Sequence, residues 1–179
     1  SARLPDAIHD EAYSAALVLK TIADNDGLVD GYSFWTFSDL FEEGGQFPAP
    51  FHGGFGLQTI HGIPKPTYRV FELLHHLGYE RIPLTGDAHA TVEALAVKDG
   101  DRLSILVYNH NIPGSEIQDE SLEITLKGEA PVHPVILRRI DAQHANPKQK
   151  WIDLGSPEYP DQALLAELEQ ASRLALETL

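Results

Sequence analysis

Residues 28–37, LVDGYSFWTF, carry the strongest indication of architecture in this chain. Bulky side chains stand at alternating and at neighbouring positions, with Val29, Tyr32, Phe34, Trp35 and Phe37 pointing to both faces of a strand. A strand that is apolar on both faces is typical of a parallel sheet covered on each side. The pattern therefore predicts a buried strand over 28–37. Because one such strand needs neighbours, we expect the chain to be cut out of a larger α/β domain.

A helix is expected before this strand, over residues 10–24. Asp10 is a suitable N-cap, since its side chain accepts a hydrogen bond from a free amide of the first turn. Tyr13, Ala16 and Leu17 fall on one stripe of that helix. Residues 25–27, Asn-Asp-Gly, then end the helical pattern.

A second helix is expected after a Gly- and Pro-rich loop over residues 38–63. Loops of that length in compact domains are usually functional. Pro66 suits the first helical position, and Val70, Leu74 and Leu77 follow at helical spacing. Gly78 lies where a left-handed glycine commonly ends a helix.

Beyond Tyr79 the apolar residues follow a period of two, which is typical of strands. Residues 90–97 and 103–108 flank Asp99-Gly100, a strong hairpin signal. Alternation returns at Leu122, Ile124 and Leu126, and again over 135–139. We expect an antiparallel sheet or sandwich over residues 81–140, then a Pro-rich polar stretch and an amphipathic helix over 161–177.

Composition excludes several kinds of partner and site. Lys and Arg number 13 against 27 Asp and Glu, and the resulting net charge of −14 argues against a nucleic-acid partner. No apolar run reaches the roughly 20 residues of a membrane helix, so no membrane partner is expected. The absence of Cys excludes disulfides and thiolate chemistry. A chain that begins at Ser1 and lacks Met is expected to be an internal piece or a processed product.

The sequence offers no motif for a metal or another cofactor. Nine His are present, but His75 and His76 are neighbours on the predicted helix and project about 100° apart. They cannot chelate one ion together, and no HExxH pair occurs. A P-loop and a dinucleotide fingerprint are also missing, so we expect no cofactor.

Three motifs in close succession carry a family resemblance: residues 30–43, DGYSFWTFSDLFEE; residues 51–57, FHGGFGL; and residues 63–68, IPKPTY. Together they resemble glycoside hydrolase family 39, which contains the β-xylosidases and α-L-iduronidases. The resemblance implies an α/β plus all-β fold, a TIM (β/α)8 barrel followed by an antiparallel β-sandwich. On that mapping residues 1–80 are the last segment of the barrel. Residues 81–179 are a sandwich domain with a C-terminal helix, which we expect to be truncated.

The same resemblance assigns sugar-binding residues to this chain and implies that the catalytic residues lie outside it. Both catalytic carboxylates of the family would precede Ser1, so no catalytic residue is expected in this chain. Trp35 would stack on the sugar beside the scissile bond, and Glu42 and Glu43 would accept hydrogen bonds from its hydroxyls. Phe41 and His52 would shape the site. The competing interpretations are a core Trp35, a solvated Glu42-Glu43 pair and a His52 that only orders its loop.

The resemblance implies a retaining β-xylosidase that removes xylosyl residues from xylooligosaccharides, of which this chain is an inactive piece. The alternatives are an iduronidase-like or other glycosidase, and a non-catalytic sugar-binding or scaffold module. The expected partners are a small carbohydrate substrate and the N-terminal remainder of the barrel, while a homo-oligomer is left open. The lack of Cys favours a bacterial protein, with the cytoplasm as the favoured compartment.

Overall fold

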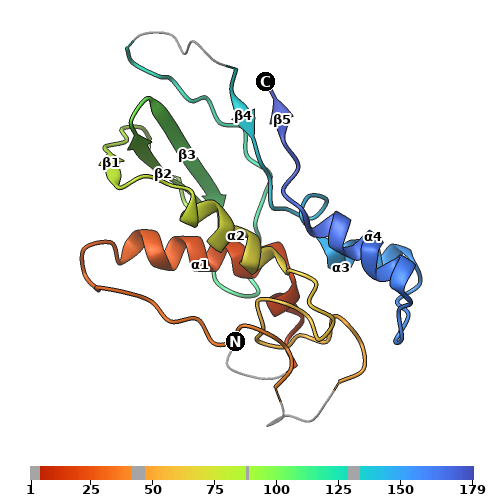
Figure 1. Ribbon diagram of the computed structural model, residues 1–179. Helices are drawn as coiled ribbons and strands as arrows, with labels where there is room; N and C mark the ends of the chain where they lie inside the picture. Colours follow the sequence, from red (N-terminus) through yellow and green to blue (C-terminus); the bar gives the residue numbers. More distant parts are fainter. Residues whose placement is uncertain (1–4, 42–46, 88, 129–133) are drawn as a thin grey trace.

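The computed structural model describes residues 5–41, 47–87, 89–128 and 134–179. Figure 1 shows a helix pair, α1 and α2, packed beneath a small sheet, with the long loops that join the two helices on the side away from the sheet. The C-terminal helices α3 and α4 lie beside these loops. The elements in chain order are η1 (Ala7–Asp10), α1 (Ala12–Asp24), α2 (Pro66–His75), β1 (Glu80–Ile82), β2 (Val92–Asp99), β3 (Arg102–Asn109), β4 (Ile136–Leu137), α3 (Pro147–Asp153), α4 (Gln162–Ser172) and β5 (Glu177–Thr178).

Helix α1 forms where a helix was predicted, but its cap and its buried face differ from the prediction. Asp10 ends the short 3-10 helix η1 and is fully buried, and Glu11 takes the N-cap position without a side-chain cap bond. The core-facing residues are Ala15 and Leu19, four apart on one face, while Leu17 is exposed. The predicted stripe is therefore wrong at Leu17, whereas Ala16 packs against the core as predicted. The neighbours that cover the helix, and not only its own periodicity, fix which face is buried.

Helix α2 begins at Pro66 as predicted and ends at His75. Gly78 is not the left-handed residue expected after it: its φ lies outside the positive region, and His76 takes the C-cap. Gly78 is needed for a close approach instead. A Cβ there would lie 2.4 Å from the carbonyl oxygen of Lys98 and 2.5 Å from the Cβ of Asp99.

The predicted hairpin is confirmed. Strands β1, β2 and β3 form an antiparallel sheet in that order, and Asp99 pairs with Arg102 across a two-residue turn in which Gly100 has φ +58°. Such a turn requires a residue that tolerates positive φ, which glycine does without steric cost. The sheet packs on the helix pair through one hydrophobic cluster, whose buried members are Ala15, Leu19, Val70, Leu95, Val97 and Tyr108.

The predicted strand over 28–37 does not form. The described chain has no strand beside these residues, and the first ladder contact is an isolated parallel bridge between Ser38 and Gln58. A strand without a hydrogen-bonding neighbour has no ladder to hold it. The bulky side chains of this stretch, which the pattern placed in a core, are therefore exposed: Leu28, Val29, Tyr32, Phe34, Trp35 and Phe37.

The C-terminal part also departs from the prediction. Residues 121–127, predicted as a strand, form neither a strand nor a helix, while β4 and β5 form a two-stranded antiparallel ribbon. The polar stretch contains an unpredicted helix, α3, capped by the Asn146 side chain, which accepts from the Gln149 amide. Helix α4 stops at Ser172, five residues before the predicted end, because the chain becomes extended at Arg173 and then enters β5.

Candidate functional site

Trp35 lies on the loop between α1 and α2, and 67% of its surface is exposed. Its ring meets the Phe41 ring edge-on, with centroids 5.6 Å apart and planes at 88°. The peptide bond between Trp35 and Thr36 is cis. An edge contact of this kind fixes the orientation of an indole while leaving most of it accessible.

The backbone that follows Trp35 is joined to a second segment of the same loop. The Thr36 amide donates to the Phe55 carbonyl at 3.3 Å, and the Leu57 amide donates back to the Thr36 carbonyl at 2.9 Å. Two further bonds link residues 37 and 39 to Gln58. Residues 36–39 and 55–58 therefore run side by side as a short paired unit.

Three charged side chains meet beneath this unit, and we call Asp10, Asp39 and Lys65 the buried triad. The Lys65 Nζ atom lies 2.6 Å from Asp10 Oδ1 and 2.6 Å from Asp39 Oδ2. The side chains of Lys65, Asp10 and Asp39 are exposed by only 0%, 1% and 0%. Such a cluster is far from the solvated charge pairs that loops ordinarily carry.

The triad is also hydrogen-bonded to the backbone of residues 53–56, which we call the glycine-rich segment. The second oxygen of Asp10 accepts from the Gly53 amide at 2.7 Å, and the second oxygen of Asp39 accepts from the Gly56 amide at 2.7 Å. Lys65 Nζ donates to the Gly54 carbonyl at 3.0 Å. Each member of the triad thus holds one point of residues 53–56.

The glycine at position 54 is required by this packing. A Cβ there would lie 2.4 Å from the Asp39 Oδ1 atom and 2.9 Å from the His52 Nε2 atom. Any side chain would push the carboxylate off its amide partner. The close approach, rather than a special φ, therefore explains this glycine.

Two carboxylates share one ammonium in the triad, and this crowding affects the pKa of Asp39. Burial raises the pKa of the Asp39 carboxyl, while the charge and hydrogen bond of Lys65 and the Gly56 amide act in the opposite direction. The Asp10 carboxylate raises it further. A carboxylate in this position is less easily ionised than a free one because its charge is taken out of water.

The other predicted site residues take different positions. His52 is partly buried; its Nδ1 atom lies 3.0 Å from the Ala49 carbonyl oxygen, and its ring stacks on Phe47 at 4.7 Å. Glu42 and Glu43 lie outside the described residues. The structure therefore brings together Trp35 with Phe41, and His52 with Gly54, but it leaves the predicted hydrogen bonds of the glutamates untested.

The residues that sequence reasoning missed are Asp10, Asp39 and Lys65, together with His9. The His9 Nδ1 atom lies 2.9 Å from the Gly53 carbonyl oxygen, and its ring contacts Phe55 at 4.9 Å. A signal existed for two of them: Asp39 stands inside an aromatic motif and Lys65 stands between two prolines, where charges are out of place.

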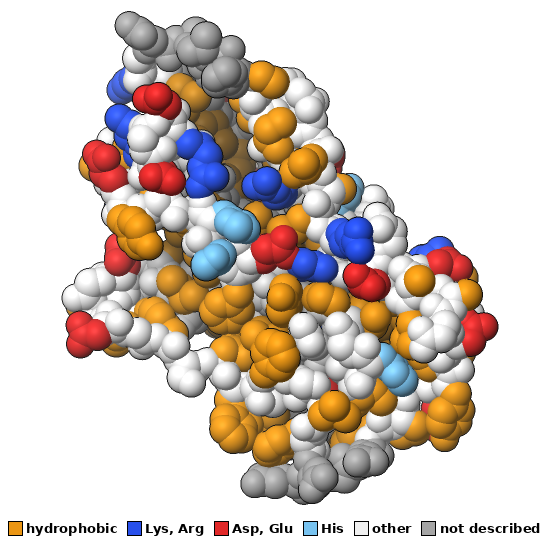
Figure 2. Space-filling view, in the orientation of Figure 1, with side chains coloured by type: hydrophobic (Ala, Val, Ile, Leu, Met, Phe, Trp, Pro, Cys, Tyr) orange, Lys and Arg blue, Asp and Glu red, His pale blue; other side chains and the backbone are white. Residues whose placement is uncertain are grey.

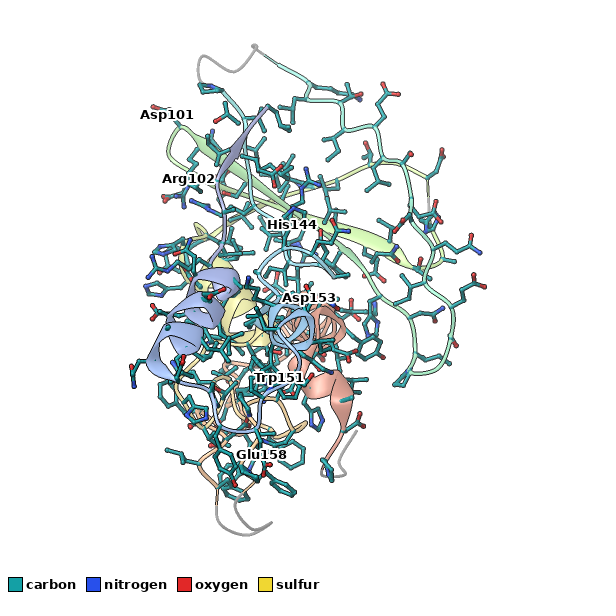
Figure 3. The ribbon with its side chains drawn as sticks, turned by 90° about the vertical axis from the view of Figure 1, so that its right-hand side faces the viewer. Asp101, Arg102, His144, Trp151, Asp153 and Glu158 are labelled. Atoms are coloured by element: carbon teal, nitrogen blue, oxygen red, sulfur yellow. The ribbon has the colours of Figure 1, made fainter. Side chains whose placement is uncertain are left out.

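The C-terminal helices pack against the loop between α1 and α2. Leu168 of α4 is fully buried and packs with Phe51 and Ile63 of the loop, and Trp151 of α3 joins the same cluster. Figure 3 labels Trp151 on α3, next to α4. Its indole N–H donates to the Pro157 carbonyl at 2.9 Å. The glycine-rich segment is thus held between the triad and this cluster.

Figure 2 shows apolar side chains crowded over the lower part of the molecule, where the long loops lie. The exposed apolar residues between positions 28 and 40 belong to those loops. Within the described ranges no helix combines the length and apolar character needed to cross a bilayer. Nor do three or more His, Cys, Asp or Glu residues converge there in an arrangement that suits a metal ion.

Comparison with known proteins finds relatives among glycosyl hydrolases family 39 and the β-xylosidases. The model of glycosyl hydrolases family 39 matches residues 1–178. A β-xylosidase of Caldicellulosiruptor saccharolyticus is 45% identical over 174 residues, which are 96% of this chain and 36% of that protein. A β-xylosidase of Geobacillus stearothermophilus is 32% identical over 166 residues, 92% of this chain and 32% of that protein.

Solved structures agree. A family 39 enzyme from Xanthomonas axonopodis pv. citri superposes with a TM-score of 0.75 at 33% identity, covering 99% of this chain and 37% of that one. A family 39 β-xylosidase from Caulobacter crescentus superposes with a TM-score of 0.71 at 30% identity. The match covers 100% of this chain and 38% of that one. The chain spans about a third of the length of these relatives. On the match to the family model and the two β-xylosidases, this chain belongs to glycoside hydrolase family 39.

Proposed function

We propose that this chain is the C-terminal part of a retaining β-xylosidase and supplies one side of its sugar-binding site. The observation that carries the proposal is Trp35, a largely exposed indole whose following backbone is hydrogen-bonded to a segment held by buried charges. An exposed aromatic on a rigid support is suited to stacking against the apolar face of a sugar ring. Phe41 orients it, and Glu42 and Glu43 accept hydrogen bonds from the sugar hydroxyls.

The fold proposal is that residues 1–80 complete a (β/α)8 barrel and residues 81–179 form a sandwich domain. The exposed apolar stretch from Leu28 to Phe37 supports it, because its sequence is typical of a strand buried on both faces, yet these side chains lack covering neighbours in the described chain. The preceding part of the barrel provides those neighbours. It also provides the two carboxyl groups, about 5–5.5 Å apart, that double displacement requires.

In this arrangement one carboxylate attacks the anomeric carbon while the other protonates the leaving group, and water then releases xylose. The residues of the present chain bind and orient the sugar. Contacts that strengthen as the ring flattens in the transition state raise the rate as well as the affinity. The substrate is accordingly a terminal xylosyl residue of a xylooligosaccharide.

The test uses the full-length protein that contains this chain, with 4-nitrophenyl β-xyloside and an α-L-iduronide as alternative substrates. Trp35→Ala is expected to raise the KM for the xyloside about tenfold, which corresponds to about 1.4 kcal/mol of lost binding. Tyr159→Ala is the control, since Tyr159 is also an exposed aromatic but lies in the loop between α3 and α4. Preference for the iduronide would overturn the substrate assignment. Equal KM values for the two variants would remove Trp35 from the site.

A further inference from the structure

We infer that the buried triad of Asp10, Asp39 and Lys65 positions Trp35 for sugar binding. This inference rests on the proposed function, since it assigns the triad a role in that same site. None of the three side chains reaches the surface, so they act through the backbone and not through contact with the sugar.

The first step of the argument is the connection from the triad to the glycine-rich segment. Asp10 accepts from the Gly53 amide, and Asp39 accepts from the Gly56 amide. Lys65 donates to the Gly54 carbonyl. These are charge-assisted bonds, which are shorter and stronger than neutral ones. The one residue between these anchors is Phe55, whose backbone is thereby fixed on both sides.

The second step is the connection from Phe55 to Trp35. The Phe55 carbonyl accepts from the amide of Thr36, the residue bonded directly to Trp35, and Leu57 donates to the Thr36 carbonyl. Asp39 contributes twice, because its own amide donates to Gln58 at 2.9 Å in the same paired unit. A shift of residues 53–56 therefore moves the backbone to which the indole is attached.

The third step concerns the choice of carboxylates. Asp39 presents one oxygen to the Gly56 amide and the other to Lys65, and Asp10 divides its oxygens between Gly53 and Lys65 in the same way. An ionised carboxylate accepts at both oxygens, whereas an asparagine amide accepts at only one. At position 39, substitution by Asn consequently breaks one of the two bonds, and substitution by Ala breaks both. The two variants therefore weaken the link to residues 53–56 by different amounts.

The experiment compares Asp39→Asn and Asp39→Ala in the full-length protein. Lys20→Met is the matched control, because Lys20 also pairs with two carboxylates, those of Asp24 and Glu93, but on the side of α1 that faces the sheet. Two readouts are taken: the kinetic constants for 4-nitrophenyl β-xyloside, and the hydrogen exchange of the peptides that contain Thr36 and Leu57.

The expected result is a KM that rises about threefold in Asp39→Asn and about tenfold in Asp39→Ala, equivalent to about 0.6 and 1.4 kcal/mol. We expect kcat to fall by less than the KM rises, since the triad acts on the backbone that carries Trp35, a binding residue. The Thr36 and Leu57 amides should exchange about tenfold faster in Asp39→Ala. Lys20→Met should match the wild type in both readouts.

The inference is overturned if Thr36 and Leu57 keep wild-type protection in a folded Asp39 variant, or if kcat falls while KM stays constant. Should Asp39→Ala fail to fold, Asp39→Asn decides the matter by the same two readouts. A wild-type protein without xylosidase activity would sink the proposed function, and the exchange measurement would still decide whether the triad holds the Trp35 backbone.

Discussion

Lys65 shows how a single residue can organise a loop. Its stem is enclosed, and its ammonium meets two carboxylates and a carbonyl, so no part of its charge is left to water. Such a cluster contributes little net stability over apolar packing, but removal of one member leaves uncompensated charge in the interior. The geometry of the loop around residues 53–56 thus depends on keeping all three charges together.

Removal of the ammonium is expected to be costly. In Lys65→Met, two buried carboxylates lose the cation that they share, and we expect a loss of about 3–5 kcal/mol in the free energy of unfolding. This loss is measured by thermal unfolding of the full-length protein, in which the variant should have a lower unfolding midpoint than the wild type.

Lys20→Met is the control, because Lys20 also pairs with two carboxylates but is partly exposed. This substitution should lower the free energy of unfolding by about 1 kcal/mol or less. If both variants unfold at the same temperature, Lys65 is not an essential partner of the two aspartates.

At the scale of elements, local signals predicted some segments and failed at others. Pro66 at the start of α2 and the glycine turn between β2 and β3 are fixed by backbone chemistry, and both were predicted. The strand over 28–37 failed because a strand exists only with a neighbour, which local sequence cannot supply. The short α3 went unrecognised within a stretch that reads as polar and irregular.

Helix α4 is expected to stabilise the loop between α1 and α2 chiefly through Leu168, its fully buried leucine. Leu168 is 0% exposed against Phe51 and Ile63, and Leu168→Ala is expected to cost about 2–5 kcal/mol because it leaves a cavity beside the loop. The loss is read from the thermal unfolding midpoint.

Leu176→Ala is the comparison, since Leu176 is 65% exposed and should change stability by no more than about 0.5 kcal/mol. Equal losses in the two variants would show that α4 does not support the loop through Leu168.

At the scale of the whole molecule, the helix pair and the sheet meet at an interface with titratable groups. Lys20 of α1 donates to Glu93 of β2 at 2.6 Å, and Tyr108 of β3 donates to the other oxygen of Glu93 at 2.9 Å. His110 lies beside Tyr13 of α1, with ring centroids 5.1 Å apart. Burial first, and the Lys20 charge second, lower the pKa of His110, while Glu93 and Asp24 oppose the shift.

This interface predicts a loss of stability on acidification. Between the lowered pKa of His110 and its ordinary value of 6.5, the unfolded chain binds a proton that the folded chain does not, so stability falls as the pH decreases through this range. We expect His110→Phe to reduce the difference in unfolding midpoint between about pH 7.5 and pH 5.

His75→Phe is the control, because His75 is an exposed histidine on α2. An undiminished pH dependence in His110→Phe would assign the acid sensitivity to groups other than His110.

The sequence by itself determined the family, the two helices and the hairpin. These features depend on residues close together in the chain: a proline at a helix start, a turn glycine, and motifs of 14, 7 and 6 residues in fixed order. Only the tertiary structure decided that Asp10, Asp39 and Lys65 share one buried site, and that Leu168 packs on Phe51. The physical reason is that ion pairing and burial depend on distance in space, and the residues concerned are separated by tens of positions along the chain.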